Sequence, residues 1–149
     1  ERLHVTLHEV VCARPLLQRD VDAAVVAASS VACPPIPIVF EQAGSFRRGP
    51  HADKSPVVLR GDARSDAGIA GLRQSLAVAL RRAGLRVRPA ATPHMTLHDD
   101  ARFIDAHPIA PLAWTATRFA LIVSHVGAGH HQGVRRWRLS SDGNVVPCD

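Results

Sequence analysis

Hydrophobic and polar residues alternate in the first segment of the chain, from Leu3 to Val10, as they do in a strand with one face on the core. Further along, apolar residues recur at spacings of three and four, which predicts a helix from Asp66 to Ala83. Its apolar face consists of Ile69, Leu72, Leu76 and Leu80. Ser65 or Asp66 can cap this helix at its start, and Gly84 can end it.

The remaining pattern predicts an α+β fold. A second helix is expected over Asp20–Val31, and Cys33-Pro34-Pro35 stops it. Strands are expected over Ile36–Phe46, Pro56–Arg60, Thr92–His98, Trp114–Val126 and Arg135–Ser140. Loops are expected in the proline-rich stretch His107–Pro111 and in the glycine-rich stretch Gly127–Gly133. The order β-α-β-β-α-β-β-β indicates two helices over a mostly antiparallel sheet, in one domain spanning residues 1–149.

Composition narrows the class of protein. The 149 residues contain no long apolar window, so a membrane span is not expected. The three cysteines are widely spaced, which favours reduced thiols and a cytoplasmic location. The formal net charge is +5, and Lys54 is the only lysine among 18 cationic residues. Arginine suits phosphate binding, so an anionic partner is one explanation, and a compositional bias of the genome is the other.

A five-residue motif occurs twice, as His4-Val5-Thr6-Leu7-His8 and as His94-Met95-Thr96-Leu97-His98. In a strand the two histidines and the threonine of each copy share one face, and the two apolar residues share the other. Two such strands would therefore line a groove with imidazoles and hydroxyls.

That set of groups suits the hydrolysis of a phosphodiester. One histidine can deprotonate a water while the other protonates the leaving oxygen on the far side of phosphorus. The threonine hydroxyls can donate to the non-bridging oxygens, and arginines can offset the charge. This scheme requires no metal and no cofactor.

Paired His-x-Thr-x motifs on strands resemble those of the 2H phosphoesterase superfamily, and in particular its LigT-like branch of RNA 2′,3′-cyclic phosphodiesterases, also called 2′-5′ RNA ligases. The most specific segment is Pro93-His94-Met95-Thr96-Leu97, supported by Leu3–Leu7, Arg118–Val123 and Arg136–Leu139. The resemblance implies a bilobal fold of antiparallel sheets with a pseudo-two-fold axis, helices packed outside and a cleft between the lobes.

The resemblance also implies an activity and roles for four residues. The activity is hydrolysis of 2′,3′-cyclic phosphate ends of RNA or of cyclic nucleotides to 2′-phosphates, with reverse 2′-5′ ligation. His4 would be the proton donor and His94 the proton acceptor, and Thr6 and Thr96 would bind the phosphate. A non-catalytic module that binds RNA ends or nucleotides is the rival function.

The chain departs from the family pattern in three ways. Members usually carry a strand and a helix before the first motif, so either a preceding segment is expected beyond this sequence or a second chain supplies that strand. An arginine often follows the second motif, whereas Asp99 and Asp100 occur here and Arg102 comes later. His8 and His98 replace apolar or small residues, and could be solvated rim residues, substrate contacts or part of a four-histidine metal site.

Two further interpretations stay open. Phe46-Arg47-Arg48 could stack a base and bind a phosphate, or be a core aromatic followed by solvated charges. The other five histidines are expected on the surface or in loops: His51, His107, His125, His130 and His131.

Overall fold

The computed structural model describes residues 3–11, 15–47, 52–88, 92–125, 130–140 and 147–148. Within them the elements follow the order β1 (Val10–Val11), α1 (Gln18–Ser29), β2 (Ile36–Ser45), β3 (Ser55–Gly61), α2 (Ala63–Arg82), β4 (Arg86–Val87), β5 (His94–Asp100), β6 (His107–Ala116), β7 (Arg118–His125), β8 (His130–Arg138) and β9 (Pro147–Cys148). The expected α+β class, with two helices and antiparallel sheets, is confirmed for the described residues.

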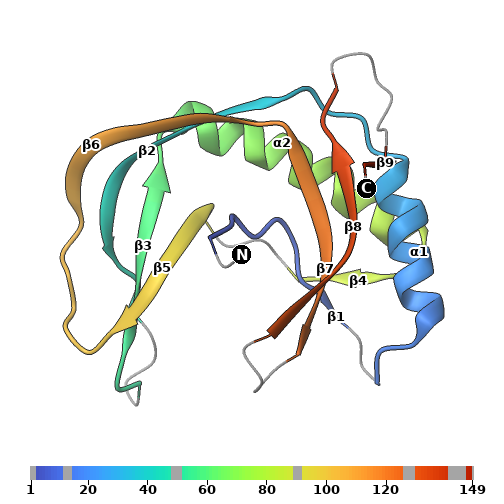
Figure 1. Ribbon diagram of the computed structural model, residues 1–149, viewed down its shortest axis with the longest axis horizontal. Coiled ribbons are helices and arrows are strands. Elements are labelled where there is room, and N and C mark those ends of the chain that lie inside the picture. Colours follow the sequence, from blue (N-terminus) through green and yellow to red (C-terminus); the bar gives the residue numbers. More distant parts are fainter. Residues whose placement is uncertain are drawn as a thin grey trace.

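Three antiparallel sheets contain the described strands. A four-stranded sheet has the order β5-β3-β2-β6, a three-stranded sheet has the order β7-β8-β9, and β1 pairs with β4. Figure 1 shows the four-stranded sheet and the β7–β8 hairpin on opposite sides of the N-terminal segment, with α2 crossing behind. The two larger sheets thus flank the segment that carries the first histidine motif.

The apolar face predicted for α2 forms the centre of the core. Its leucines and isoleucine are at most 6% exposed and pack against residues of β2, β7 and β8. The main members of this core are Ile36, Ile38, Phe40, Ile69, Leu72, Leu76, Leu80, Phe119, Trp137 and Leu139. Helix spacing in the sequence therefore identified the buried side of α2 correctly.

The start of α2 differs from the prediction. Asp62, and not Ser65 or Asp66, is the N-cap, and its carboxylate accepts the backbone N–H of Ser65 at 2.7 Å. The Ser65 hydroxyl is buried and accepts the backbone N–H of Val39 at 2.8 Å, which ties α2 to β2. At the other end, Gly84 has a φ of +78° and follows the last turn as expected.

The predicted strand over Leu3–Val10 is wrong for most of its length. It forms one isolated bridge, Val5 with Met95, and regular pairing begins only at β1. Arg73 of α2 donates to the backbone oxygen of Thr6 at 2.6 Å, so part of this backbone bonds to a helix side chain instead of a neighbouring strand.

The proline-rich stretch is a strand and not a loop, because β6 pairs with β2 from His107 to Ala116. Its prolines are tolerated since β6 is an edge strand and its register shifts opposite Phe40 and Gln42. The expected long strand Trp114–Val126 is in fact divided between two sheets, with the break at Thr117.

The last long strand also begins earlier than predicted. β8 starts at His130, within the stretch expected to be a loop, because residues 130–133 pair with β7. Residues 127–129, the rest of that expected loop, lie outside the described part of the chain. In the residues that the structure describes, no helix is long and apolar enough to cross a membrane.

Candidate active site

The two histidine motifs meet at the bridge between Val5 and Met95. In an antiparallel pair, the residues that flank the bridge partners oppose one another in the reverse order. His4 therefore lies across from Thr96, and Thr6 lies across from His94. Each imidazole is next to the hydroxyl of the other motif, an arrangement with approximate two-fold symmetry.

The first histidine and the threonine of each motif lie on a side that faces away from the core. Val5 and Met95 pack against the hydrophobic core, as the alternation of faces predicts. His4, Thr6 and Thr96 are exposed, and His94 is half-buried. The four residues predicted for catalysis and phosphate binding are thus together on one accessible surface.

The ring of His94 is held by two contacts. Its Nδ1 lies 2.8 Å from the backbone oxygen of Thr92, and the Phe46 ring packs edge-to-face at 4.8 Å between centroids. A carbonyl oxygen can only accept, so Nδ1 must carry the proton and Nε2 of the neutral ring is left with its lone pair. His94 therefore has the tautomer that a proton acceptor at Nε2 needs.

His4 has a different environment, because its ring packs edge-to-face against His131 of β8 at 5.7 Å between centroids. The sequence interpretation placed His131 on the surface or in a loop. It is exposed, but it belongs to the site. No local signal could have shown this, since the contact depends on how the β7–β8 hairpin meets the N-terminal segment.

The second histidines of the motifs are separate from this pair. His8 Nε2 lies 2.6 Å from the backbone oxygen of Arg73, and His98 Nε2 lies 3.6 Å from Asp100. A backbone N–H from Arg102 is the main cause of a lowered pKa at Asp100. Among the described residues, no three histidine, cysteine, aspartate or glutamate side chains are grouped closely enough to hold a metal ion.

Arg73 connects the first motif to α2. It is 9% exposed, and burial lowers the pKa of its guanidinium. It donates to Thr6, and its own backbone oxygen is the partner of His8. This helix residue therefore positions a segment that has only one bridge to a strand.

The aromatic and cationic loop after β2 contributes to the site in a way the sequence left open. Phe46 is half-buried against His94, so its ring supports the histidine. The Arg47 guanidinium lies 4.5 Å from the centroid of the Phe103 ring. Arg48 lies outside the described residues.

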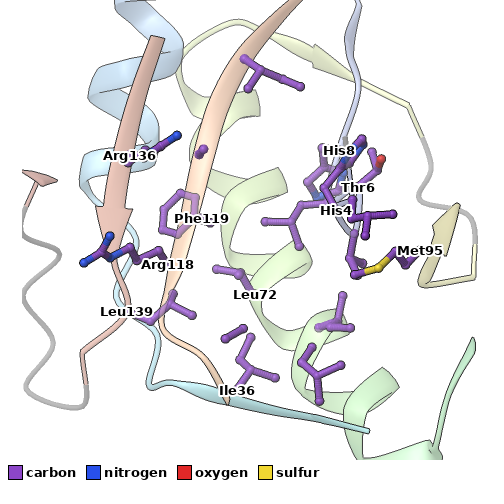
Figure 2. Close-up of a pocket in the computed structure, with 18 of the residues that line it drawn as sticks. His4, Thr6, His8, Ile36, Leu72, Met95, Arg118, Phe119, Arg136 and Leu139 are labelled. Atoms are coloured by element: carbon purple, nitrogen blue, oxygen red, sulfur yellow. The ribbon is translucent and has the colours of Figure 1, made fainter. Parts of the chain in front are cut away.

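A hollow of about 1080 Å³ adjoins the first motif. Figure 2 shows His4, Thr6 and His8 beside Met95 on one side of it, with Phe119 on the other. His94 and Thr96 do not line it. The surface that carries both motifs is therefore next to this hollow and not inside it. The candidate site is defined by the Val5–Met95 bridge, which brings the two motifs together.

Comparison with known proteins places the chain in a family. A model of the 2′-5′ RNA ligase superfamily matches residues 1–128, and the chain belongs to that superfamily. This confirms the resemblance based on the histidine motifs, and the family is one of phosphoesterases and ligases. Among curated protein sequences, none matches the chain.

Solved structures show the same fold. E. coli LigT in complex with 3′-AMP is 21% identical, with a TM-score of 0.69, over 93% of this chain and 78% of that one. LigT without ligand is 25% identical, with a TM-score of 0.67, over 93% of this chain and 77% of that one. A Thermus thermophilus protein is 18% identical, with a TM-score of 0.66, over 92% and 78% of the two chains.

Proposed function

We propose that the protein hydrolyses 2′,3′-cyclic phosphodiesters at RNA ends or in nucleotides to 2′-phosphomonoesters, by two-histidine acid–base catalysis without a metal. The observation that carries this proposal is the bridge between Val5 and Met95, because it sets each histidine beside the threonine of the other motif. The complexes of E. coli LigT with 3′-AMP, ATP and NADP⁺ add support, since those ligands are nucleotides.

His94 is the proton acceptor in this mechanism. With Nδ1 protonated toward the Thr92 oxygen, Nε2 takes a proton from a water molecule as that water attacks phosphorus. Phe46 restrains the ring, so the lone pair of Nε2 keeps one direction.

His4 is the proton donor. As the new P–O bond forms, the bond from phosphorus to the 3′-oxygen breaks, and the protonated imidazole of His4 gives that oxygen a proton. The products are a 2′-phosphate and a free 3′-hydroxyl, with the proton from water on His94. The same steps with the 5′-hydroxyl of a second RNA in place of water would form a 2′-5′ phosphodiester and release the 3′-hydroxyl, which is 2′-5′ ligation.

Thr6 and Thr96 bind the non-bridging phosphate oxygens. Both hydroxyls are exposed on the surface that carries the histidines, and each lies across from one of the two imidazoles. The backbone of Thr6 is held by Arg73 and that of Thr96 by its pairing with β3. Hydroxyl donors held in place in this way stabilise negative charge without reorganising during the reaction.

The test is turnover of a panel of 2′,3′- and 3′,5′-cyclic nucleotides in excess EDTA, with the phosphomonoester identified by NMR. Hydrolysis of the 2′,3′-cyclic compounds to 2′-phosphates is expected. His4→Ala and His94→Ala should each reduce kcat by about 10²-fold or more. His98→Ala is a matched control, because that histidine contacts Asp100 instead.

Full activity in either His4→Ala or His94→Ala would overturn the assigned roles, and a 3′-phosphate product would overturn the assigned leaving group. Nucleotide binding without any product would instead favour a non-catalytic module that binds RNA ends or nucleotides.

A further inference from the structure

Arg60 of β3 is the cross-strand neighbour of His94. The register of β3 with β5 pairs Arg60 with His94 and, one step along, Leu59 with Met95. Directly opposed residues in an antiparallel pair share a face of the sheet, with Cβ atoms about 4.5–5.5 Å apart. Because Leu59 and Met95 belong to the core side, Arg60 and His94 are both on the outer side.

The bridge between the motifs extends this row of neighbours. His94 has Arg60 on one flank and Thr6 on the other. A guanidinium, an imidazole and a hydroxyl are therefore adjacent across three segments that are far apart in the sequence. This is a suitable set of groups for a phosphoryl group, since two of them can donate to oxygen while the imidazole acts on water.

The side chain of Arg60 has unused hydrogen-bonding capacity. It is half-buried, and its Nε is a buried nitrogen with no hydrogen-bond partner among the described residues. A buried donor without a partner is costly, so such groups usually have a function or a ligand. The planar fork of arginine matches the geometry of two phosphate oxygens.

Arg102, the arginine that follows β5, contacts an aspartate and not the site. Arg102 follows the far end of β5 from His94, and its Nε lies 3.9 Å from the carboxylate of Asp100. Its side chain is 90% exposed. Arg102 is thus close to the second motif in the sequence, but it has no place in the row that contains His94.

We propose that Arg60 is a further catalytic residue, which contacts the phosphoryl oxygens and stabilises the charge that they gain as water adds to phosphorus. The proposal rests on the function proposed above. Thr6 and Thr96 are neutral donors, so without Arg60 no fixed positive charge would lie beside His94 in this row.

The experiment compares Arg60→Gln and Arg60→Lys with the control Arg102→Gln. Hydrolysis of a 2′,3′-cyclic nucleotide is measured together with calorimetric binding of a nucleoside 2′-phosphate, which requires no turnover. Arg60→Gln should lower kcat by about 10²–10³-fold, the effect of losing one preorganised donor at a reacting oxyanion. Arg60→Lys should recover part of that loss because it keeps the charge, and Arg102→Gln should match the unmodified protein.

The pH dependence of 2′-phosphate binding distinguishes a phosphate contact from a purely structural role, because a structural role would not change it. The second ionisation of a phosphomonoester has a pKa near 6, so the affinity lost in Arg60→Gln should be greater above that pH than below it. Thermal melting of each variant checks that the fold is retained.

The outcomes separate this proposal from the proposed function. If Arg60→Gln behaves as Arg102→Gln does in both assays, or if its loss of binding is the same at both pH values, the assignment of Arg60 is wrong. If the unmodified protein hydrolyses no cyclic nucleotide but binds the 2′-phosphate through Arg60, the phosphate contact is supported and the proposed hydrolysis is not.

Discussion

Individual side chains give the two histidines of the site different environments. The Thr92 oxygen and the Phe46 ring hold His94, whereas His4 packs against a third imidazole, that of His131. The motifs are equivalent in sequence, so this difference comes entirely from their neighbours. It agrees with a division of labour in which one imidazole accepts a proton and the other donates one.

The N-cap of α2 should make stability depend on pH. Hydrogen bonds from Ser65 lower the pKa of Asp62 below its usual 3.8, so the ionised carboxyl favours the folded state. That contribution is fully present above the usual pKa and is lost as pH falls through the lower, folded value. Asp62→Asn keeps a capping oxygen but not the charge, and should have a lower Tm at neutral pH.

The difference between Asp62→Asn and the unmodified protein should narrow as the pH falls below 3.8. Thermal melts across an acidic pH series measure it, with Asp53→Asn as a control in an exposed position outside the helices. A difference in Tm that stays constant down to the lowest pH would show that the Asp62 charge contributes nothing.

At the scale of elements, the first motif is stabilised by a helix more than by a sheet. Its backbone has one bridge to β5, and Arg73 of α2 donates to Thr6 at 2.6 Å. The alternation of residues 3–10 predicted which side chains would face the core. It could not predict the strand pairing, because partners along the edge of β5 are set by tertiary contacts.

Replacement of Arg73 should therefore disturb the site at a distance. Arg73→Met keeps an apolar stem on α2 but removes the donor to Thr6, and should lower stability by about 1.5–3 kcal/mol. Because Thr6 and His4 lose their anchor, kcat should fall by about 10-fold, with a smaller change in KM. Steady-state kinetics and denaturant unfolding measure both effects.

Arg81→Met is the matched control, since Arg81 is exposed in the last turn of the same helix. If Arg73→Met loses stability but keeps its kcat under conditions where it is fully folded, Arg73 supports the fold and does not position the motif.

At the scale of the whole molecule, Trp137 joins the β7–β8 hairpin to the helices. It is fully buried, stacks on Phe119 at 5.0 Å between centroids, and donates from Nε1 to the Ser29 hydroxyl of α1 at 3.0 Å. The hairpin that it anchors carries His131, the neighbour of His4. Packing far from the surface thus determines where one wall of the site lies.

Trp137→Ala should destabilise the protein by about 3–5 kcal/mol, because it leaves a large cavity in the core. Ser29→Ala removes the hydrogen-bond partner of the indole, together with the exposed bond from this hydroxyl to the Val25 oxygen, and should cost about 1–3 kcal/mol. Chemical denaturation measures both. Equal losses in the two variants would mean that the hydrogen bond, and not packing, anchors the hairpin.

The sequence by itself determined the family and the buried face of α2, because local periodicity and a repeated motif encode them. The same motif predicts the four site residues His4, Thr6, His94 and Thr96. The sequence did not show that β6 is a strand, because its prolines are typical of a loop. An edge strand with a shift in register tolerates those prolines, and both features depend on the tertiary structure.

Only the tertiary structure decided which residues surround those four. The contacts of His94 with Phe46 and Arg60, and of His4 with His131, join segments separated by dozens of residues. Such contacts follow from strand register, and a register depends on the packing of both partners against a common core. The motif therefore predicts the chemistry, and the pairing of strands decides which charges and rings act on it.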